Sequence, residues 1–365
     1  MKISDVTKFL EEQAPLQLQE TYDNSGLQTG SGEWDAKGIL CTIDVTEEVI
    51  DEAIRNGDNL IIAHHPVIFK DLRTLTDRSW TERVLVKAIR NEIAIYVAHT
   101  NLDNVYSGVN NMICTKMGLA DFQILKTGKN ELVKLVTFVP SGYADAVRNA
   151  LFAAGAGHIG NYDSCSYNVK GQGTFRAGDG SNPFTGEIGK THFEEEVRIE
   201  TIVPRSRLVM CIAALTNSHP YEEVAYDVYP VENSYQKVGS GMTGILQSPL
   251  NHDELMILIK KIFNTSLIRY SGKQNTTYKK IAVCGGSGFF LLKDAIRAKA
   301  DVFITSDVKY HQFFETEGKI LICDIGHYES EQFTKDIFYH LLKEKFSTFA
   351  VHLSKIVTNP IKYFT

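Results

Sequence analysis

The stretch that decides the fold is residues 59–66, which read NLIIAHHP. Its four consecutive apolar residues are typical of a short strand buried on both faces of a parallel sheet. Adjacent histidines on a continuing strand would point to opposite faces, but Pro66 ends this strand directly after His64 and His65. Both imidazoles can therefore turn toward one site, although a histidine pair in a loop is more often structural than a metal ligand.

Strands and helices alternate on both sides of this stretch. Further elements are predicted around it, with strands at 38–44 and 92–98 and helices at 46–56 and 81–91. The same alternation returns near the C-terminus, where strands are predicted at 280–284, 301–305 and 319–324, and a closing helix at 332–345. Short apolar strands that alternate with helices indicate an α/β fold with a mostly parallel sheet, covered on both faces.

A segment of different character interrupts this alternation at about residues 126–244. Nine glycines fall between residues 155 and 189, a density typical of loops and bends. The predicted strands of this segment alternate apolar and polar residues, as half-exposed antiparallel strands do. We therefore predict an α/β domain formed by residues 1–125 and 245–365, split around an inserted α+β domain of residues 126–244.

The composition excludes several classes of protein. At 365 residues the chain has room for two domains, and its net charge of −6 without a basic block argues against nucleic acid or an anionic membrane as partner. No apolar run approaches the roughly 18 residues of a membrane span, and the start of the chain lacks the apolar segment of an export signal. The six cysteines are too widely spaced for a zinc ribbon or a redox motif. We expect a cytoplasmic protein whose cysteines are small buried hydrophobes.

Ligand-type residues follow five of the predicted strands. Because ligands of open parallel sheets bind at the carboxyl ends of the strands, these residues describe one site drawn from both halves of the split domain. Three histidines and two carboxylates form the predicted metal set, namely His64, His65, Asp103, His327 and Glu331. Such a set suits two divalent ions per chain with a bridging carboxylate. It favours zinc first, then iron, manganese, cobalt or nickel, over calcium or magnesium.

Each member of this set also has a purely structural interpretation. His327 and Glu331 are four residues apart and would share one face of a helix, but this spacing is common on solvated helices. Asp103 could instead cap the helix that follows it. His99 and Asp307, which also end predicted strands, are candidate catalytic residues for proton transfer or for orienting a ligand. Their alternative role is that of a satisfied buried polar group.

A glycine-rich turn lies between a predicted strand and a predicted helix. Backbone N–H groups at such a place could hold a phosphate, so Gly285, Gly286, Ser287 and Gly288 are candidates for binding one. The turn lacks the full dinucleotide fingerprint and the lysine of a P-loop, which argues against a dinucleotide-dependent oxidoreductase. A tight turn required by packing is the alternative.

Five motifs together resemble the NIF-three-like family, also labelled GTP cyclohydrolase I type 2 homolog. They are YDNSGLQ at 22–28, AHHP at 63–66, HTNLD at 99–103, TSD at 305–307 with His311, and GHYESE at 326–331. The resemblance implies a dinuclear metal site at the five residues of the predicted metal set, all of which are intact. It also implies a toroidal homohexamer whose metal sites face an internal cavity. The insert, with HPYEE at 219–223, resembles the ferredoxin-like, PII-like domain of longer bacterial members.

Two functions from different classes remain open at this point. The first is a metal-dependent hydrolase of the cyclohydrolase type, which acts on a nucleotide or another phosphorylated heterocycle and anchors phosphate at the glycine-rich turn. The second is a non-enzymatic regulatory or metal-handling hexamer, in which the insert senses a small molecule. The ligand set motivates the first function, and the insert motivates the second because a hydrolase does not require it.

Overall fold

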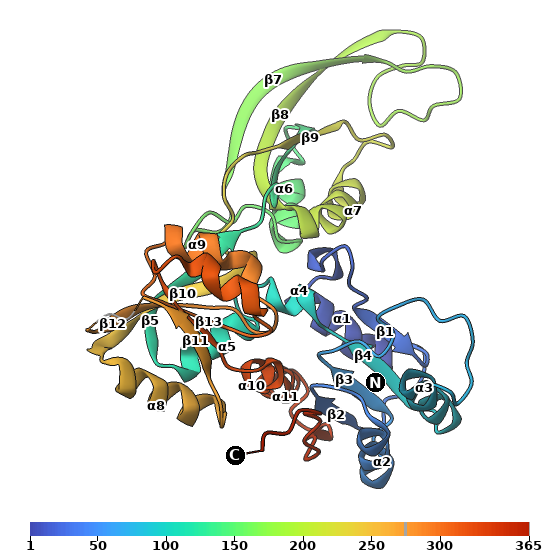
Figure 1. Cartoon of the computed structure of the whole chain (residues 1–365). Coiled ribbons are helices and arrows are strands. Elements are labelled where there is room, and N and C mark those ends of the chain that lie inside the picture. Colours follow the sequence, from blue (N-terminus) through green and yellow to red (C-terminus); the bar gives the residue numbers. More distant parts are fainter. Residues whose placement is uncertain (274–275, 365) are drawn as a thin grey trace. The chain divides into compact units, whose positions relative to one another are not determined.

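The computed structural model describes residues 1–273 and 276–364. It divides into two compact units (Figure 1). One is formed by Met1–Thr127 together with Gln236–Thr365, and the other by Gly128–Tyr235. Within the described residues, no helix is long and apolar enough to cross a membrane.

The first unit contains two separate sheets instead of the single sheet expected from the sequence. In the first sheet the strand order is β1-β4-β3-β2-β15, with β1 antiparallel to β4 and the other pairs parallel. Every residue of β2, β3 and β4 is buried, as the apolar runs predicted. The strands are β1 (Gly26–Thr29), β2 (Ile39–Thr42), β3 (Leu60–Ala63), β4 (Ala94–Val97) and β15 (Val351–Leu353).

Helices cover both faces of this first sheet. In β3, Leu60 and Ile62 belong to one apolar cluster and Ile61 and Ala63 to another, because successive side chains of a strand point to opposite faces. The Leu60 cluster includes α1 and α11, and the Ile61 cluster includes α2 and α3. These helices are α1 (Ile3–Gln13), α2 (Glu47–Asn56), α3 (Trp80–Arg90) and α11 (Thr334–Lys345).

Helix α2 shows why these helices begin and end where they do. Thr46 Oγ1 accepts a hydrogen bond from the Val49 N–H at 3.4 Å, which satisfies one free donor of the first turn. Gly57 ends the helix in the left-handed conformation, with φ at 77°. The charged first and last turns complement the helix dipole.

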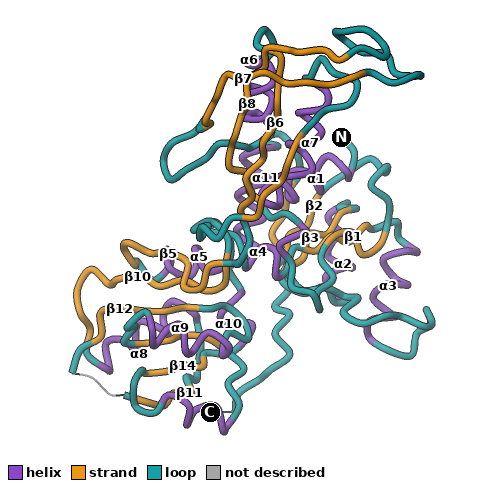
Figure 2. Tube along the Cα trace, turned by 90° about the horizontal axis from the view of Figure 1, so that it is seen from above, coloured by secondary structure: helices purple, strands orange, loops and turns teal. Residues whose placement is uncertain are grey.

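The second sheet of this unit is mixed, and Figure 2 shows most of its strands side by side. Its order is β11-β14-β13-β12-β10-β5, in which only β12, β13 and β14 are parallel. The strands are β5 (Leu119–Thr127), β10 (Gly239–Leu250), β11 (Arg269–Gly272), β12 (Tyr278–Val283), β13 (Val302–Thr305) and β14 (Leu321–Asp324). The other helices of the unit are α4 (Thr100–Asp103), α5 (Val109–Lys116), α8 (His252–Phe263), α9 (Leu292–Arg297) and α10 (His327–Glu331).

The second unit is an antiparallel sheet with two helices on one face. Its strand order is β7-β8-β6-β9. Leu135, Val139 and Val197 of the sheet share one apolar cluster with Val147 and Leu215 of the helices. Its elements are β6 (Leu132–Pro140), α6 (Ala144–Ala153), β7 (Ser166–Arg176), β8 (Thr191–Pro204), α7 (Leu208–Ser218) and β9 (Tyr226–Pro230).

Strand β7 differs from the sequence prediction. The glycine-rich region 155–189 was expected to form loops and bends, yet it contains the whole of β7, which pairs with β8 along all its eleven residues. Glycine weakens a strand because it brings no side chain to pack and loses more backbone entropy. Long-range pairing with β8 has overridden this low strand propensity here.

The boundary at the end of the second unit also differs from the sequence prediction. The insert was expected to extend to residue 244, but β10 begins at Gly239 and pairs with β5 and β12 of the first unit. Residues 236–244 therefore belong to the first unit.

Candidate metal centre

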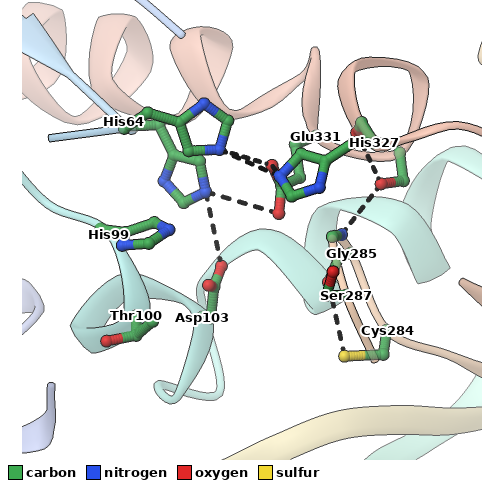
Figure 3. Close-up of polar contacts among 12 residues, drawn as sticks. His64, His99, Thr100, Asp103, Cys284, Gly285, Ser287, His327 and Glu331 are labelled. Carbon is green, nitrogen blue, oxygen red and sulfur yellow. Dashed lines mark hydrogen bonds and ion pairs between the residues drawn. The ribbon is translucent and has the colours of Figure 1, made fainter. Parts of the chain in front are cut away.

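Four side chains lie around that of Glu331 in the first unit (Figure 3). Glu331 Oε2 lies 2.9 Å from His65 Nε2 and 3.1 Å from His327 Nε2. Glu331 Oε1 lies 3.7 Å from His64 Nε2, and Asp103 Oδ1 lies 3.8 Å from the same nitrogen. The structure thus brings all members of the predicted metal set into one cluster.

Three short segments at the ends of strands deliver these side chains. His64 and His65 directly follow β3, and Asp103 is the last residue of the short helix α4 that follows β4. His327 and Glu331 are the first and last residues of α10, after β14. Their spacing of four residues places them on one face of the helix, as expected.

Each of the three histidines is oriented by a hydrogen bond on the side away from the cluster. The Nδ1 atoms of His64, His65 and His327 lie 3.0 Å from Ala98 O, 2.7 Å from Asp44 Oδ1 and 2.6 Å from Asp307 Oδ2. Carbonyl and carboxylate oxygens can only accept, so Nδ1 carries a proton in every case. The Nε2 atoms are thereby directed into the cluster, which is how metal-binding histidines are held in proteins.

Two atoms of the cluster are buried without a hydrogen-bond partner. They are His64 Nε2 and Asp103 Oδ1, two of only five such side-chain atoms among the described residues. An unsatisfied buried polar atom costs about 1–3 kcal/mol, so native structures rarely keep one without a reason such as an ion. A cation between these two atoms would satisfy both, and the nitrogen and oxygen donors fit a divalent metal.

The possible ligand atoms form three overlapping groups, in each of which the atoms lie within 4.8 Å of one another. One group contains His65, His327 and Glu331, and another contains His64, Asp103 and Glu331. The third consists of His64, His65 and His99. Glu331 is the carboxylate that the first two groups share.

Electrostatics ties these groups together. Burial alone would lower the pKa of His65, but hydrogen bonds to Asp44 and Glu331 outweigh it and raise the pKa to about 9. Burial opposes the charge of His327 too, yet the neighbouring carboxylates raise its pKa to about 11. Burial and the charge of Glu331 raise the pKa of Asp103. In the metal-free chain, the protonated imidazoles of His65 and His327 therefore neutralise the negative charge of the neighbouring carboxylates. A bound cation would neutralise the same charge.

His99 lies beside the cluster and is held by a residue that the sequence analysis did not single out. Its ring centroid lies 5.2 Å from that of His64 and 5.4 Å from that of His65. Asp23 Oδ1 accepts from His99 Nδ1 at 2.8 Å. Burial alone would raise the pKa of Asp23, but the contact with His99 outweighs burial and keeps this pKa well below its usual value. Asp23 also accepts from the Thr100 hydroxyl.

Asp307 contacts a member of the cluster and a member of the glycine-rich turn. Its Oδ2 accepts from His327 Nδ1 and from the Ser287 hydroxyl, and the bond to His327 lowers the pKa of Asp307. The hydrogen bond to Asp307 fixes the orientation of the His327 ring, and the role of Asp307 in the site stays a prediction.

The glycine-rich turn makes room for Glu331. A Cβ atom on Gly286, where φ is 61°, would lie 2.3 Å from Glu331 Oε1. Three N–H groups of the turn already donate hydrogen bonds of 2.9–3.0 Å within the protein. The donors are Gly285, Gly286 and Gly288, and the acceptors are, in that order, the side-chain oxygens of Asn110, Ser330 and Thr305. These contacts support the packing interpretation of the turn, and they leave Ser287 as its one residue whose N–H has no partner among the described residues.

One residue that the sequence analysis raised lies apart from the cluster. His311 is exposed, with its ring 5.2 Å from that of Tyr310. Cys284 is buried near the cluster, and burial raises the pKa of its thiol, so it remains a neutral side chain. Asp44 and Asp23 were not predicted. Asp44 could have been found by the same rule as the others, since it is the last residue of the predicted strand 38–44.

Comparison with known proteins places this arrangement in a family. The profile of the Duf34/NIF3 (NGG1p interacting factor 3) family matches residues 1–360. The protein named GTP cyclohydrolase 1 type 2 homolog of Halalkalibacterium halodurans is 40% identical over 372 residues, which cover 100% of both chains. The protein of the same name from Bacillus subtilis is 36% identical over 98% of this chain and 97% of its own. The crystal structure of a Bacillus cereus protein related to NIF3 has a TM-score of 0.87 and 36% identity, and the match covers 100% of this chain and 99% of that one. The chain therefore belongs to the Duf34/NIF3 family, which confirms the resemblance of its motifs.

Proposed function

We propose that the protein is a metal-dependent hydrolase that acts on a nucleotide or another phosphorylated heterocycle. In this proposal His64, His65, Asp103, His327 and Glu331 hold two divalent ions, with zinc favoured. Bound divalent ions supply Lewis-acid activation of a substrate oxygen and of water. The names of the relatives point to the same class of reaction.

The observation that carries the proposal is the shared carboxylate of Glu331. One of its oxygens faces His65 and His327, and the other faces His64. A carboxylate with ligand groups on both oxygens is suited to bridge two cations. The unpartnered His64 Nε2 and Asp103 Oδ1 support a cation on the second side.

His99 is assigned the transfer of a proton. Asp23 accepts from Nδ1–H, which leaves Nε2 as the ring nitrogen that can take up or release a proton. The same Asp23 contact fixes the orientation of the ring. Ser287 is the residue of the glycine-rich turn assigned to the substrate phosphate, because the other three N–H groups of the turn are bonded within the protein.

The proposal includes the assembly and the second unit. We propose a toroidal homohexamer and a ferredoxin-like, PII-like fold for the inserted domain. The antiparallel sheet of the second unit, with α6 and α7 on one face, supports the latter. Sedimentation or light scattering of the full chain checks the hexamer.

Metal analysis of the purified full chain tests the centre. We expect two first-row divalent ions per chain, and we expect Glu331→Ala to lose both because the two ligand groups share this residue. Asp103→Ala and His327→Ala are expected to lose one ion each. The matched control is Glu329→Ala on the same helix, since Glu329 Oε1 accepts from Asn359 Nδ2 at 3.0 Å instead of joining the cluster. Wild-type protein without stoichiometric metal, or Glu331→Ala with full metal content, would refute the centre.

A turnover screen tests the activity separately. The metal-loaded chain is incubated with nucleotides and with cyclic amides, and products are followed by liquid chromatography. We expect His99→Gln to keep its metal and to lower turnover about 10²–10⁴-fold, the usual contribution of a general acid or base. A metal-loaded chain that turns over none of these compounds would refute the hydrolase and favour the second candidate function. That function is a regulatory assembly, for which the second unit contains a cavity suited to a small molecule.

A further inference from the structure

The second unit contains a cavity of about 680 Å³, a volume typical of small-molecule sites. It is lined by β7, β8, the loop after β7 and the loop at residues 221–225. Phe138, Glu196 and Arg198 line it from the sheet, and their neighbours Val139, Val197 and Ile199 belong to the apolar cluster under the helices. Because successive side chains of a strand alternate, the cavity lies on the face of the sheet that α6 and α7 leave open.

A buried carboxylate lies in the wall of this cavity. Glu196 is only 9% exposed, and its Oε1 accepts from the Tyr221 hydroxyl at 3.0 Å. Its Oε2 accepts from no side chain or backbone group of the described residues. Burial and the negative charge of Glu196 raise the pKa of Tyr221, so the hydroxyl stays a donor. Oε2 is not among the described side-chain atoms that are fully buried without a partner, so this oxygen is accessible. Because Glu196 lines the cavity, Oε2 can accept a hydrogen bond from a ligand there.

Two glycines of β7 leave the space that this carboxylate and a ligand require. A Cβ atom on Gly173 would lie 2.1 Å from Glu196 Oε2, so a side chain there would displace the carboxylate. A Cβ atom on Gly171 would meet no atom within 4 Å, which means that Gly171 borders open space. Two glycines of this glycine-rich region, Gly171 and Gly173, therefore leave space for the cavity and for the Glu196 carboxylate.

The remaining walls are aromatic and are held in place. The Tyr221 ring lies 6.0 Å from that of Phe175 and 6.2 Å from that of Phe184, between centroids. His219 Nδ1 accepts from the Tyr221 N–H at 3.1 Å, and its Nε2 donates to Phe138 O at 3.0 Å. Burial lowers the pKa of His219, which keeps the imidazole neutral in this role. The HPYEE run therefore shapes the cavity.

The charges of the cavity favour a cation over an anion. Arg198, a basic residue of the wall, is already paired, since its Nη2 lies 2.9 Å from Glu200 Oε1. Lys170 and Arg176 also line the cavity, but both are exposed, as are the acidic lining residues Glu222 and Glu223. Glu196 is the buried charge, and aromatic rings around a carboxylate are suited to an ammonium group on an apolar body.

We propose that this cavity binds a small molecule with an aromatic or aliphatic body and a protonated amine or amidine, which donates to Glu196 Oε2. This site is distinct from the metal centre, and the inference does not depend on the hydrolase. Failure of either proposal leaves the other testable, because the metal centre is read out by metal content and this site by binding.

Direct binding to the full chain tests the site with three probes of similar shape. Phenethylamine carries the cation, 2-phenylethanol is neutral, and 3-phenylpropionate carries an anion. Titrations followed by isothermal calorimetry and by saturation-transfer NMR are expected to show at least tenfold tighter binding of phenethylamine than of the other two. Equal or tighter binding of 3-phenylpropionate, or no binding of phenethylamine at millimolar concentration, would overturn the proposal.

Variants locate the binding. Glu196→Gln keeps the shape but removes the charge, and it is expected to weaken phenethylamine binding at least tenfold. Glu195→Gln makes the same change at the adjacent exposed residue and is expected to have no effect. Gly171→Leu projects a side chain into the cavity without a clash at Cβ and is expected to abolish binding. Unchanged binding in both Glu196→Gln and Gly171→Leu would overturn the assignment.

A second copy of the chain is the competing occupant of this face. Light scattering of Gly171→Leu distinguishes the two occupants. If Gly171→Leu dissociates the assembly and the wild type does not bind the amine, the small-molecule site would be overturned. An unchanged oligomeric state with lost amine binding would support it.

Discussion

A single methyl group at Gly286 is expected to disturb the metal centre. The Cβ of Gly286→Ala would lie 2.3 Å from Glu331 Oε1, whereas real Cβ contacts essentially never fall under 3.0 Å. The carboxylate oxygen must therefore move by about 0.7 Å, the difference between these two distances. Glu331 is 3% exposed, so it has little room to move without losing its neighbours.

The size of the effect follows from the tolerance of metal coordination. Ligand distances in metal sites stay within about 0.2 Å of their ideal values, so a displacement several times larger removes a good ligand. Disturbing the support of a ligand typically weakens metal binding about 10–100-fold. We expect a loss of at least this size in Gly286→Ala, and for both ions, because Glu331 belongs to both ligand groups.

The matched control is Gly57→Ala at the end of α2. Gly57 also has a positive φ, at 77° compared with 61° for Gly286, but its Cβ would meet no atom within 4 Å. Both variants carry the left-handed backbone penalty of about 1–2 kcal/mol, which urea unfolding measures. Only Gly286→Ala is expected to lose metal in competition with a chelating dye. Equal metal affinity in the two variants would refute the position assigned to Glu331.

The remaining predictions concern protons, orientation and stability. Raised pKa values keep His65 and His327 protonated at pH 7 in the metal-free chain, and the pKa of Asp103 is raised to about 7. Metal loading is therefore expected to release about two protons from the imidazoles and part of a third from Asp103, counted by calorimetry in buffers of different ionisation enthalpy. Metal affinity must then rise with pH between about 6 and 8, and a flat profile would contradict this. Asp44→Asn is expected to weaken metal binding about 10–100-fold in chelator competition, because it weakens the acceptor on His65 Nδ1. Asn251→Ala removes the cap of α8 and is expected to cost about 1 kcal/mol in urea unfolding with unchanged metal content.

Local sequence rules predicted much of the candidate site. Strands β3 and β4 are parallel neighbours, so the rule that ligands gather at carboxyl ends brought His64, His65 and Asp103 together. The spacing of His327 and Glu331 correctly placed both on one helix face. Their role as metal ligands stays a prediction that the metal analysis tests.

Long-range pairing could not be predicted in the same way. The alternation of strands and helices indicated parallel β structure, but it carries no information on which strands pair, and the first unit forms two sheets. Likewise, nothing local to Asp23 indicates His99, which lies 76 residues further along the chain. Glycine density indicated bends where β7 forms, because the pairing with β8 lies outside any local window.

The wide separation of the proposed metal ligands has a consequence for biosynthesis. His65 and Glu331 are 266 residues apart in the chain. At about 5–20 residues per second, a ribosome needs on the order of ten to fifty seconds to reach Glu331 after His65 has been made. Strand β15, which completes the first sheet beside β2, follows later still. The nascent N-terminal half therefore presents three of the five proposed ligands and an open sheet edge during this interval. A metal ion delivered before translation ends would find only part of the proposed coordination shell.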